Sequence, residues 1–556
     1  MAGIHHAVDC PEISGEGAVK SHCLAFSHIP HSSRLFLDFI ADFPKVEQFY
    51  PRPPHFGQWF KDEAALIHYD PARRERMAGI LERQNRNWGA SAKTLASIAR
   101  FRSGAAVVVT GQQVGLFGGP LFSLFKALSA VKLAAEASAG GVDTIPVFWL
   151  ATQDHDLEEV NHASLPGADG QLVKLVAPSH GVSDAPVSRV KFGDEIEPVV
   201  HEAMQLLGES EASKWLREAY RPGETLGTAF ARLFTHLFGE WGVILLDSSD
   251  AELNAIVEPI YHAAIETAAQ LDDALLARGK ELEAAGYHQQ VKVTPSSTLL
   301  FTLQEGARIP VHRRANGNSQ EFLIADEKLS QAELEQRISA APEKFSANVL
   351  LRPVTQDYLL PTLAYTGGAA EIAYFAQAAV VYQALLGHVT PVLPRFSATL
   401  VEPKQQRLLE KYKLSLRDLF HGPEALREAL AQRTLPPHLE AAFEKAHTAL
   451  ENSLSAIRES LARLDVTLVE AANHAAAKIE HQLEQLHARA ARAELRQSEV
   501  LVRHAEQLGG MLYPEKSLQE REVAGIYFIS RYGPELLMRL YRAVNTDCHD
   551  HQAIEL

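Results

Sequence analysis

Apolar residues follow two distinct patterns in the first half of the chain. From about residue 35 to residue 100 they recur at helical spacing, as Met77, Ile80 and Leu81 do. Then comes a continuous β-prone run at 105–109, a glycine-rich turn, a helical stretch at 121–139 and a second β-prone run at 145–151. Strand, turn, helix and strand in this order are typical of a parallel βαβ unit covered on both faces. Similar runs at 242–247 and 389–393 predict further strands, so we expect an α/β core.

Shorter and more varied segments separate the predicted core strands. Helical patterns occupy 195–207, 226–238 and 251–285. Short strand-like pieces at 291–293, 298–303, 309–312 and 321–324 are separated by turn residues, which indicates a small antiparallel insertion. We therefore predict a core over residues 1–400 with an inserted connecting region at about 165–345.

The last third of the chain has a different periodicity. From Leu450 to Ala475 the apolar positions are spaced alternately by four and three residues, the heptad seam of a left-handed coiled coil. Two extra steps of four near Ile479 predict a stutter. We expect an α-helical coiled-coil domain at 401–510 and a helical segment at 511–556 that returns to the core. The long helix needs a partner, either a returning segment (425–432 or 524–543) or another subunit.

Composition excludes several classes of protein. The 556 residues include 53 Lys and Arg against 69 Asp and Glu, a formal charge of −16 that disfavours a broad nucleic-acid surface and a tRNA synthetase. Three cysteines are too few for a Cys-rich zinc site or a disulfide framework. The N-terminus lacks the pattern of a secretory signal, and no uninterrupted apolar run approaches 18 residues. We expect a cytoplasmic protein that does not enter membranes.

The densest candidate motif is TGQQVGLFGGPL at 110–121, directly after the first predicted strand. Glycines let a ligand approach the backbone, and the helix that follows would direct its N-terminus at an anion. The motif matches neither the P-loop nor the G-x-G-x-x-G pattern. A tight strand-to-helix turn is the alternative interpretation. The candidate binding residues are Thr110, Gly111, Gln112, Gly115 and Gly119, with Lys126 in the following helix and Gln113 as a candidate catalytic residue.

The second motif, TQDHD at 152–156, follows the second predicted strand. Ligands of open parallel sheets bind outside the carboxyl ends of the strands. His155 between Asp154 and Asp156 is a candidate general acid or base, or a contributor to a metal site. The alternative is an acidic helix cap followed by glutamates in the first turn.

A third group of polar residues lies between 352 and 395. Arg352 and Arg395 offer planar forks for carboxylate or phosphate, and a Gly-Gly pair precedes a predicted helix. Part of this region could be scaffold, since pairs like Arg352-Pro353 and Gln356-Asp357 are common in loops. The tail Cys548-His549-Asp550-His551 resembles a metal cluster, but chain ends are usually mobile. The candidate binding residues of the third group are Arg352, Gln356, Asp357, Gly367, Gly368, Glu371, Tyr374 and Arg395.

Five segments together resemble the bacillithiol biosynthesis cysteine-adding enzymes, the BshC family. They are TGQQVGLFGGPL, PVFWLATQDHDLEEVNH, LLRPVTQDYLLPTLAYTGGAAEIAY, PVLPRFSATLVE and LYPEKSLQERE, in the family's order and spacing. The resemblance covers essentially the whole chain. It implies a Rossmann-like doubly wound core with connecting insertions and a C-terminal coiled-coil domain that forms a homodimer. It also implies a ligase that adds cysteine to glucosamine–malate in the last step of bacillithiol formation.

This reaction indicates what else the protein binds. Amide formation from cysteine requires an activated acyl group, so ATP or ADP is the inferred cofactor, with Mg²⁺ as the candidate metal of the nucleotide and no metal ligands assigned to the chain. His155 or a neighbouring Asp would accept the proton of the amine, while Lys126 and Arg352 would neutralise phosphate or malate carboxylates. Two alternatives remain open: a nucleotide-sugar transferase on a similar fold, and a non-catalytic nucleotide-sensing coiled-coil protein.

Overall fold

The computed structural model describes residues 20–57, 59–178, 182–316, 319–433 and 435–556. The chain divides into two compact units. Unit 1 comprises the residues up to Pro166, Val173–Thr399 and Glu520–Ile554, and unit 2 comprises Gly167–Leu172, Leu400–Gln519 and Glu555–Leu556. Residues 1–19, where the sequence predicts no signal segment, lie outside the described residues.

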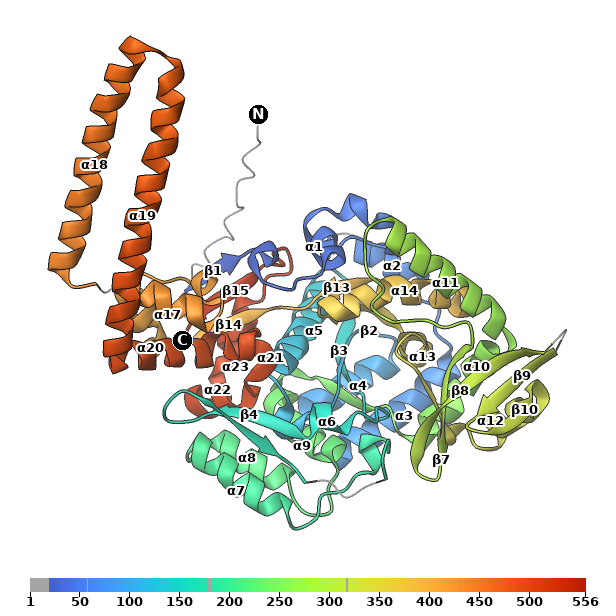
Figure 1. Ribbon diagram of the computed structural model, residues 1–556. Helices are drawn as coiled ribbons and strands as arrows, with labels where there is room; N and C mark the ends of the chain where they lie inside the picture. The colour runs from blue at the N-terminus through green and yellow to red at the C-terminus, as the bar shows by residue number, and fades with distance from the viewer. Residues whose placement is uncertain (1–19, 58, 179–181, 317–318, 434) are drawn as a thin grey trace. The chain divides into compact units, whose positions relative to one another are not determined.

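A five-stranded parallel sheet forms the centre of unit 1 (Figure 1). Its strand order is β13-β12-β2-β3-β6, so the first strand of the chain in this sheet lies in the middle. Four of the five strands are at the predicted runs, whereas β12 was not predicted. The strands are β2 (Ala106–Gln112), β3 (Thr144–Leu150), β6 (Ile244–Asp247), β12 (Thr362–Gly367) and β13 (Val392–Pro394).

Helices cover both faces of this sheet, which explains why its strands read as unbroken apolar runs. Val107 and Val109 of β2 belong to a large core shared with α3, α4 and α14, whereas Val108 packs with residues of α2 and α5. Helix α14 is long and apolar enough to cross a membrane by length and composition, but half of it is buried within the protein. These helices, with α1, are α1 (Arg34–Ala41), α2 (Trp59–Leu66), α3 (Pro71–Asn87), α4 (Ala92–Arg102), α5 (Phe122–Ala139) and α14 (Ala369–Leu386).

The chain between the strands of the central sheet contains two long connecting regions, not one. The single insertion expected at 165–345 is wrong because β6, a strand of the central sheet, lies inside it. The first connection, between β3 and β6, contains α6 (Leu157–Val160), β4 (His162–Pro166), β5 (Leu172–Val176), α7 (Ile196–Leu207), α8 (Glu211–Ala219) and α9 (Leu226–Phe238).

The second connection, between β6 and β12, contains the predicted antiparallel sheet, with strand order β10-β9-β8-β7-β11. The expected strand at 291–293 is absent. The elements are α10 (Ala251–Glu266), α11 (Ala268–Ala284), β7 (Ser297–Gln304), β8 (Ala307–Asn316), β9 (Ser319–Ile324), β10 (Glu327–Ser330), α12 (Gln331–Ala340), β11 (Phe345–Ala347) and α13 (Arg352–Leu359).

The chain rejoins unit 1 after residue 519. Strand β15 pairs with β1 in antiparallel register, Ser21 opposite Ile554, so both ends of the described chain meet in one small sheet. Beside β15, the buried His551 bonds Ser397 and Thr399 through its two ring nitrogens. The elements are β1 (Ser21–Leu24), β14 (Ala398–Val401), α21 (Gln519–Glu522), α22 (Gly525–Tyr532), α23 (Glu535–Ala543) and β15 (His551–Glu555).

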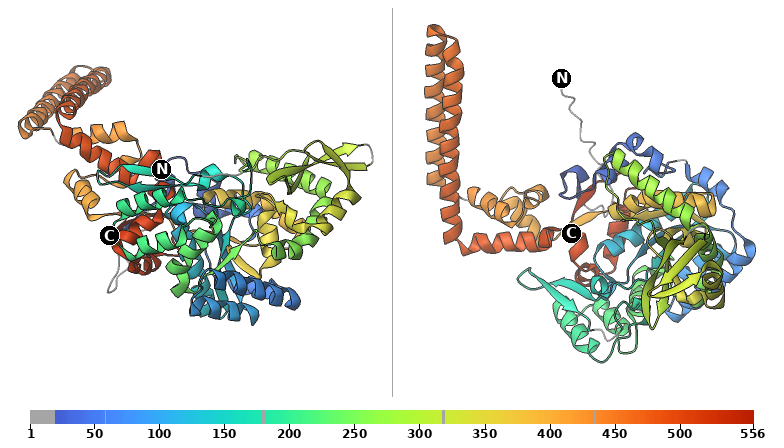
Figure 2. Two further views of the ribbon diagram at one scale, coloured as in Figure 1. Left: turned by 90° about the horizontal axis from the view of Figure 1, so that it is seen from below. Right: turned by 45° about the vertical axis from the view of Figure 1, so that its right-hand side comes forward.

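Unit 2 is helical, and its longest helices form a hairpin. Helices α18 and α19 lie side by side, drawn in orange in both views of Figure 2. The ring of Phe443 on α18 contacts that of His487 on α19, with centroids 4.8 Å apart. The helices are α15 (Pro403–Lys411), α16 (Leu416–Leu419), α17 (Pro423–Gln432), α18 (Pro437–Leu464), α19 (Thr467–Gln497) and α20 (Glu499–Leu512).

The turn of this hairpin corrects the prediction of one continuous seam from Leu450 to Ala475. Helix α18 ends at Leu464, and the side chain of Asp465 accepts hydrogen bonds from the backbone N and Oγ1 of Thr467 at 2.9 and 2.8 Å. This carboxylate caps the start of α19. The partner of α18 is therefore α19, with α17 packed against α19. The segment 524–543, proposed as a partner, lies in unit 1 instead.

Candidate functional site

A cavity of about 910 Å³ lies in unit 1 at the carboxyl ends of the central strands. Every strand of the parallel sheet contributes to its lining: Gly111–Gln113 from β2, Trp149 and Asp154 at β3, Ser248 after β6, Gly368–Glu371 after β12, and Arg395 after β13. From β2 the chain builds the sheet toward β3 and β6 and later toward β12 and β13. The cavity therefore lies at the topological switch point, where open α/β sheets bind their ligands.

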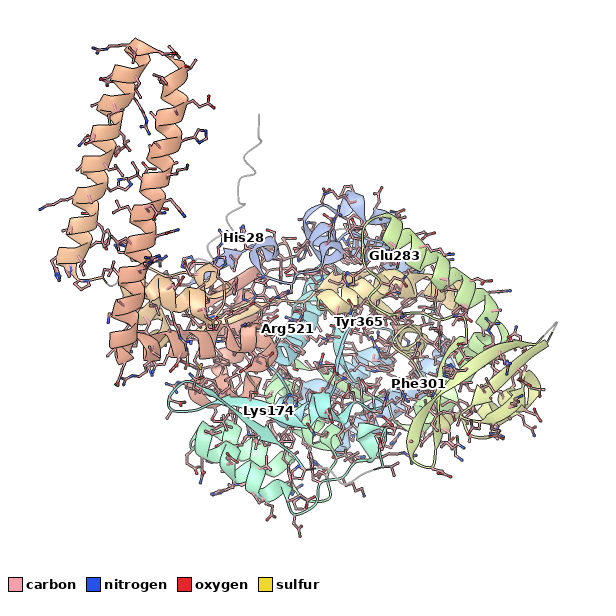
Figure 3. The ribbon with its side chains drawn as sticks, in the orientation of Figure 1. His28, Lys174, Glu283, Phe301, Tyr365 and Arg521 are labelled. Atoms are coloured by element: carbon pink, nitrogen blue, oxygen red, sulfur yellow. The ribbon has the colours of Figure 1, made fainter. Side chains whose placement is uncertain are left out.

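Residues from distant parts of the sequence complete the wall. Phe301, Arg308, Asn348 and Arg352 come from the second connection, and Arg521 comes from the C-terminal segment. In Figure 3, Arg521 and Phe301 lie on opposite sides of Tyr365, which lines the cavity between them. We call the part around Lys126, Arg352, Glu371, Arg395 and Arg521 the cationic end, and the part around Gln113, Asp154, Glu159 and Arg308 the acidic end.

The glycine-rich turn does not form the expected anion cradle. Its amides already donate elsewhere: Gly115 N to Gln113 O, Gly118 N to Tyr220 Oη and Gly119 N to Leu116 O, each at 3.0 Å. At the start of α5, Ser123 N donates to Pro120 O. A Cβ on Gly115 would lie 2.8 Å from Cα of Gly119, so glycine is needed because the turn packs against itself. The tight-turn interpretation is correct for these glycines.

The first motif still supplies part of the cavity wall. Gly111, Gln112, Gln113 and Gly115 line it. Thr110 is fully buried and donates to Thr366 O at 2.8 Å, and Gly119 packs against Ser123, so neither of the two lines the cavity.

A buried ion pair forms the base of the cationic end. Lys126 Nζ lies 2.6 Å from Glu371 Oε2 and donates to Gly111 O and Gln112 Oε1. Burial lowers the pKa of Lys126 to about 8, although the neighbouring carboxylate opposes this shift. Burial alone would raise the pKa of Glu371, but Lys126 holds it below its usual value. Tyr365 also donates to Glu371, at 2.5 Å.

Two arginines of the cationic end are held in different ways. Arg352 donates to Tyr374 Oη at 2.7 Å and Gln356 Oε1 at 3.1 Å, and forms no ion pair with any described residue. Arg395 forms a buried ion pair with Glu520, 2.6 Å from Nη2 to Oε1. The guanidinium group of Arg352 is therefore charged while its hydrogen-bond partners are neutral, which favours an anionic ligand.

Arg521 adds a further positive charge beside Arg395. Burial, and then the positive charge of Arg395, lower the pKa of Arg521, while the nearby carboxylates of Glu520, Glu371 and Glu522 oppose this shift. Cations gathered in this way repel one another, and an anion bound between them would relieve that repulsion.

The acidic end is organised by an amide. Gln113 Nε2 donates to Asp154 Oδ2 at 2.8 Å and to Glu159 Oε2 at 2.6 Å. Two carboxylates joined in this way form a favourable position for a cation or for an amine that must lose a proton. From the sequence, Glu159 was expected only in the first turn of a helix.

His155 lies beside this cavity and not in its lining. Its Nδ1 is 3.2 Å from Arg308 Nη1. A guanidinium has only donors, so Nδ1 accepts and the neutral ring carries its proton on Nε2. In this tautomer His155 has no free lone pair with which to act as a general base. Asp154, which lines the cavity, is better placed for that role. Asp156 accepts from Glu159 N at 3.3 Å, so it caps α6 as the alternative interpretation held.

The third motif divides between lining and support. Arg352, Gly368, Glu371, Tyr374 and Arg395 line the cavity. Three other candidates do not: Gln356 is buried beneath Arg352, Asp357 accepts from Tyr382 and Gln356, and Gly367 packs against Glu371.

Sequence reasoning missed several lining residues. Arg308 and Phe301 belong to segments with no local motif, and Arg521 lies in the LYPEKSLQERE segment, where no site residue was expected. Only the tertiary structure brings the three residues to the sheet. Trp149, at the end of β3, is 3% exposed, and its Nε1 has no hydrogen-bond partner among the described residues. An indole N–H buried in this way beside a cavity is available to a ligand's acceptor.

Metal coordination has little support in the described part of the chain, where no group of three or more His, Cys, Asp or Glu side chains suits a metal ion. In the tail motif, both ring nitrogens of His551 are engaged by hydroxyl groups.

Comparison with known proteins agrees with this architecture. Residues 19–396 match the family of the bacillithiol biosynthesis BshC N-terminal Rossmann-like domain, and residues 398–556 match that of the BshC C-terminal coiled-coil domain. A protein of Koribacter versatilis named "Putative cysteine ligase BshC" is 49% identical over 96% of this chain and 99% of its own length. Proteins with the same name from Solibacter usitatus and Salinibacter ruber are 35% and 34% identical, over 96% and 94% of this chain and 99% and 96% of their own.

The Rossmann-like unit, the coiled-coil hairpin and these matches over nearly the whole chain lead to one conclusion: the chain belongs to the BshC family, the ligases of bacillithiol biosynthesis.

Proposed function

We propose that this protein joins cysteine to glucosamine–malate and so forms the amide bond of bacillithiol in the last step of its synthesis. The observation that carries the proposal is the opposite charge of the two ends of the cavity. Glucosamine–malate has the same polarity, since it bears carboxylates on its malate part and an amine on its sugar. The names of the relatives support a cysteine ligase.

The cationic end suits the malate carboxylates. Arg352 has no carboxylate partner among the described residues, and Arg521 is close enough to Arg395 for that positive charge to lower the pKa of Arg521. A guanidinium binds a carboxylate through two parallel hydrogen bonds. Lys126 is less suited to direct binding because its three donors already meet Gly111, Gln112 and Glu371. We assign Lys126 to positioning of the cavity base.

The acidic end suits the sugar amine. The amine must give up a proton as it attacks the acyl carbon of cysteine, and Asp154 with Glu159 can accept it. Gln113 holds both carboxylates in place. The free N–H of Trp149 is a candidate donor to the acyl oxygen, where negative charge develops during the attack.

The carboxyl group of cysteine needs activation, for which ATP is the proposed cosubstrate. A carboxylate oxygen attacks a phosphorus atom of ATP, and ADP or pyrophosphate leaves. The amine nitrogen then attacks the acyl carbon, loses its proton and displaces phosphate or AMP. Mg²⁺ bound to the nucleotide would neutralise the phosphates, which is its usual role in such sites.

A direct assay tests the function. Purified protein is incubated with glucosamine–malate, cysteine, ATP and Mg²⁺, and the products are identified by mass spectrometry. The expected result is bacillithiol together with ADP or AMP. Folded protein that forms no bacillithiol but releases nucleotide from nucleotide sugars would instead support a transferase. Nucleotide binding without either reaction would support the non-catalytic alternative.

We also propose that the protein works as a cytoplasmic homodimer joined through the hairpin of unit 2, without nucleic acid or membrane partners. Large apolar side chains remain exposed on α18 and α19, including Ile457 (50%), Ile479 (46%) and Leu486 (56%). Apolar side chains exposed in this number on a helical hairpin are typical of a surface that a second helix pair covers.

A further inference from the structure

A second, smaller cavity of about 60 Å³ lies in unit 1 and shares two residues, Gln153 and Arg308, with the large cavity. Its wall comes from the two connecting regions and the segment after β6, and of its lining residues Gln153 alone belongs to a motif predicted from the sequence. We call it the Arg308 cavity. Its polar lining residues are Gln153, Ser188, Arg189, Ser249, Asn254, Arg308, Glu343, Lys344 and Ser346.

The inner wall of this cavity presents a positive charge that the protein does not fully neutralise. The side chain of Arg308 is only 10% exposed. It donates to Ser346 Oγ at 3.0 Å and Ala347 O at 2.7 Å, contacts His155 Nδ1 and stacks over the Phe301 ring. All of these partners are neutral. The nearest carboxylate oxygen, of Asp154, is 3.9 Å away, so a buried cation remains available to an anion.

The rim adds two exposed cations. Arg189 and Lys344 line the cavity, and neither forms an ion pair with any described residue. Glu343, also exposed, is the one acid of the lining, so cations outnumber it three to one. Ser346 Oγ accepts from Arg308 Nε, which leaves its own hydroxyl proton free to donate.

We propose that the Arg308 cavity binds a phosphate group. Arginine forks, a lysine and hydroxyl donors are the groups that hold phosphate in proteins. A water molecule needs roughly 10–15 Å³ by the same measure of volume, so this cavity holds a group of about four or five heavy atoms and excludes a nucleoside. The rest of a nucleotide would lie in the large cavity across Arg308. That the Arg308 cavity receives a phosphate group of ATP rests on the proposed ligase function. That the cavity binds phosphate does not depend on that function.

Binding measurements without cysteine or glucosamine–malate test this proposal independently of ligase activity. Phosphate, pyrophosphate, ADP and ATP are each titrated into the full-length protein by calorimetry at constant ionic strength. The test variant is R189Q/K344Q, which changes only exposed side chains and should fold. The control variant, K214Q/K280Q, removes the same charge from exposed positions on α8 and α11 outside the described cavities.

The expected result is that R189Q/K344Q weakens binding of phosphate or pyrophosphate about tenfold, while the control changes it less than about twofold. The proposal is overturned if neither ion binds, or if both variants weaken binding equally. It is also overturned if ATP binds with an affinity that R189Q/K344Q leaves unchanged.

Discussion

Lys126 Nζ lies 2.6 Å from Glu371 Oε2 and so joins helix α5 to helix α14 across the carboxyl end of the central sheet. Both residues were candidates from sequence, but their pairing was not expected. Because burial lowers the pKa of Lys126 to about 8, the charge of this pair changes close to physiological pH. The pair therefore links the charge of the cationic end to pH.

Binding of a dicarboxylate should weaken above pH 8. Below this value Lys126 is protonated, and above it the ammonium charge is lost while Glu371 stays ionised, so the cationic end becomes less positive by one charge. L-malate is fully ionised throughout this range and serves as the probe. We expect its dissociation constant to rise about tenfold between pH 7 and pH 9.5, measured by calorimetry. The K126R variant, if its circular dichroism matches wild type, should lose this dependence. A flat profile in wild type would contradict the assignment.

Arg352 should contribute to binding of glucosamine–malate and not of cysteine. R352M removes a charged fork, which we expect to raise the KM for glucosamine–malate about 30- to 100-fold, consistent with ~2–3 kcal/mol for a hydrogen-bonded charged group. R352K keeps the charge but cannot reach Tyr374 and Gln356 in the same geometry, so its effect should be intermediate. Steady-state kinetics with each substrate varied separately give the KM values for glucosamine–malate and for cysteine. An equal change in both KM values would argue for a general structural role.

Asp154 and Asp156 should differ sharply although they are two residues apart. Asp154 lines the cavity, whereas Asp156 is exposed and caps α6. We expect D154N to lower kcat at least about 100-fold, because a positioned base contributes 10²–10⁴-fold. D156N should keep kcat within about threefold and lower stability by ~1 kcal/mol or less. Rates and thermal unfolding of the two variants give the comparison. Comparable loss of kcat in both would restore the symmetrical role expected from the sequence.

His551 should make the protein sensitive to acid. Burial lowers the pKa of its imidazole to about 4. Between pH 6.5 and pH 4 the unfolded chain therefore binds a proton that the folded chain does not, and stability falls as pH falls, by up to ~1.4 kcal/mol per pH unit from this group. Wild type should lose thermal stability below pH 6.5 more steeply than H551Q. H481Q, at an exposed position on α19, is the control and should follow wild type. Parallel curves for wild type and H551Q would refute the prediction.

The hairpin of unit 2 should carry the dimer contact. I457K/I479K places charges on exposed apolar positions of α18 and α19. We expect sedimentation velocity to show a dimer for wild type and a monomer for this variant, with helix content unchanged. E451K, at an exposed polar position on α18, should remain dimeric. A wild-type monomer, or a dimer unaffected by I457K/I479K, would contradict the proposed interface.

Local pattern was enough to predict those features that depend on neighbouring residues. Continuous apolar runs located β2, β3, β6 and β13, and the period of α9 gave its bounds, Leu226–Phe238, without error. The polar residues after these strands could be expected to share a site, because parallel strands end at a common edge. The turn at Asp465 was missed because four-and-three spacing continues across it and a capping carboxylate leaves periodicity unchanged.

Packing between segments far apart in the chain decides which side chains share a cavity. It also decides which of their hydrogen-bonding atoms remain available to a ligand. Arg308 comes within 3.9 Å of Asp154 only after the second connection folds over the sheet, and no motif marks Arg308 in the sequence. Arg521 comes close enough to feel the charge of Arg395 only when the C-terminal segment returns to the sheet. Packing between distant segments also occupies the amide of Gly118, which donates to Tyr220 Oη. A residue's chemistry is local, but its free hydrogen bonds and its net electrostatic surroundings belong to the folded chain as a whole.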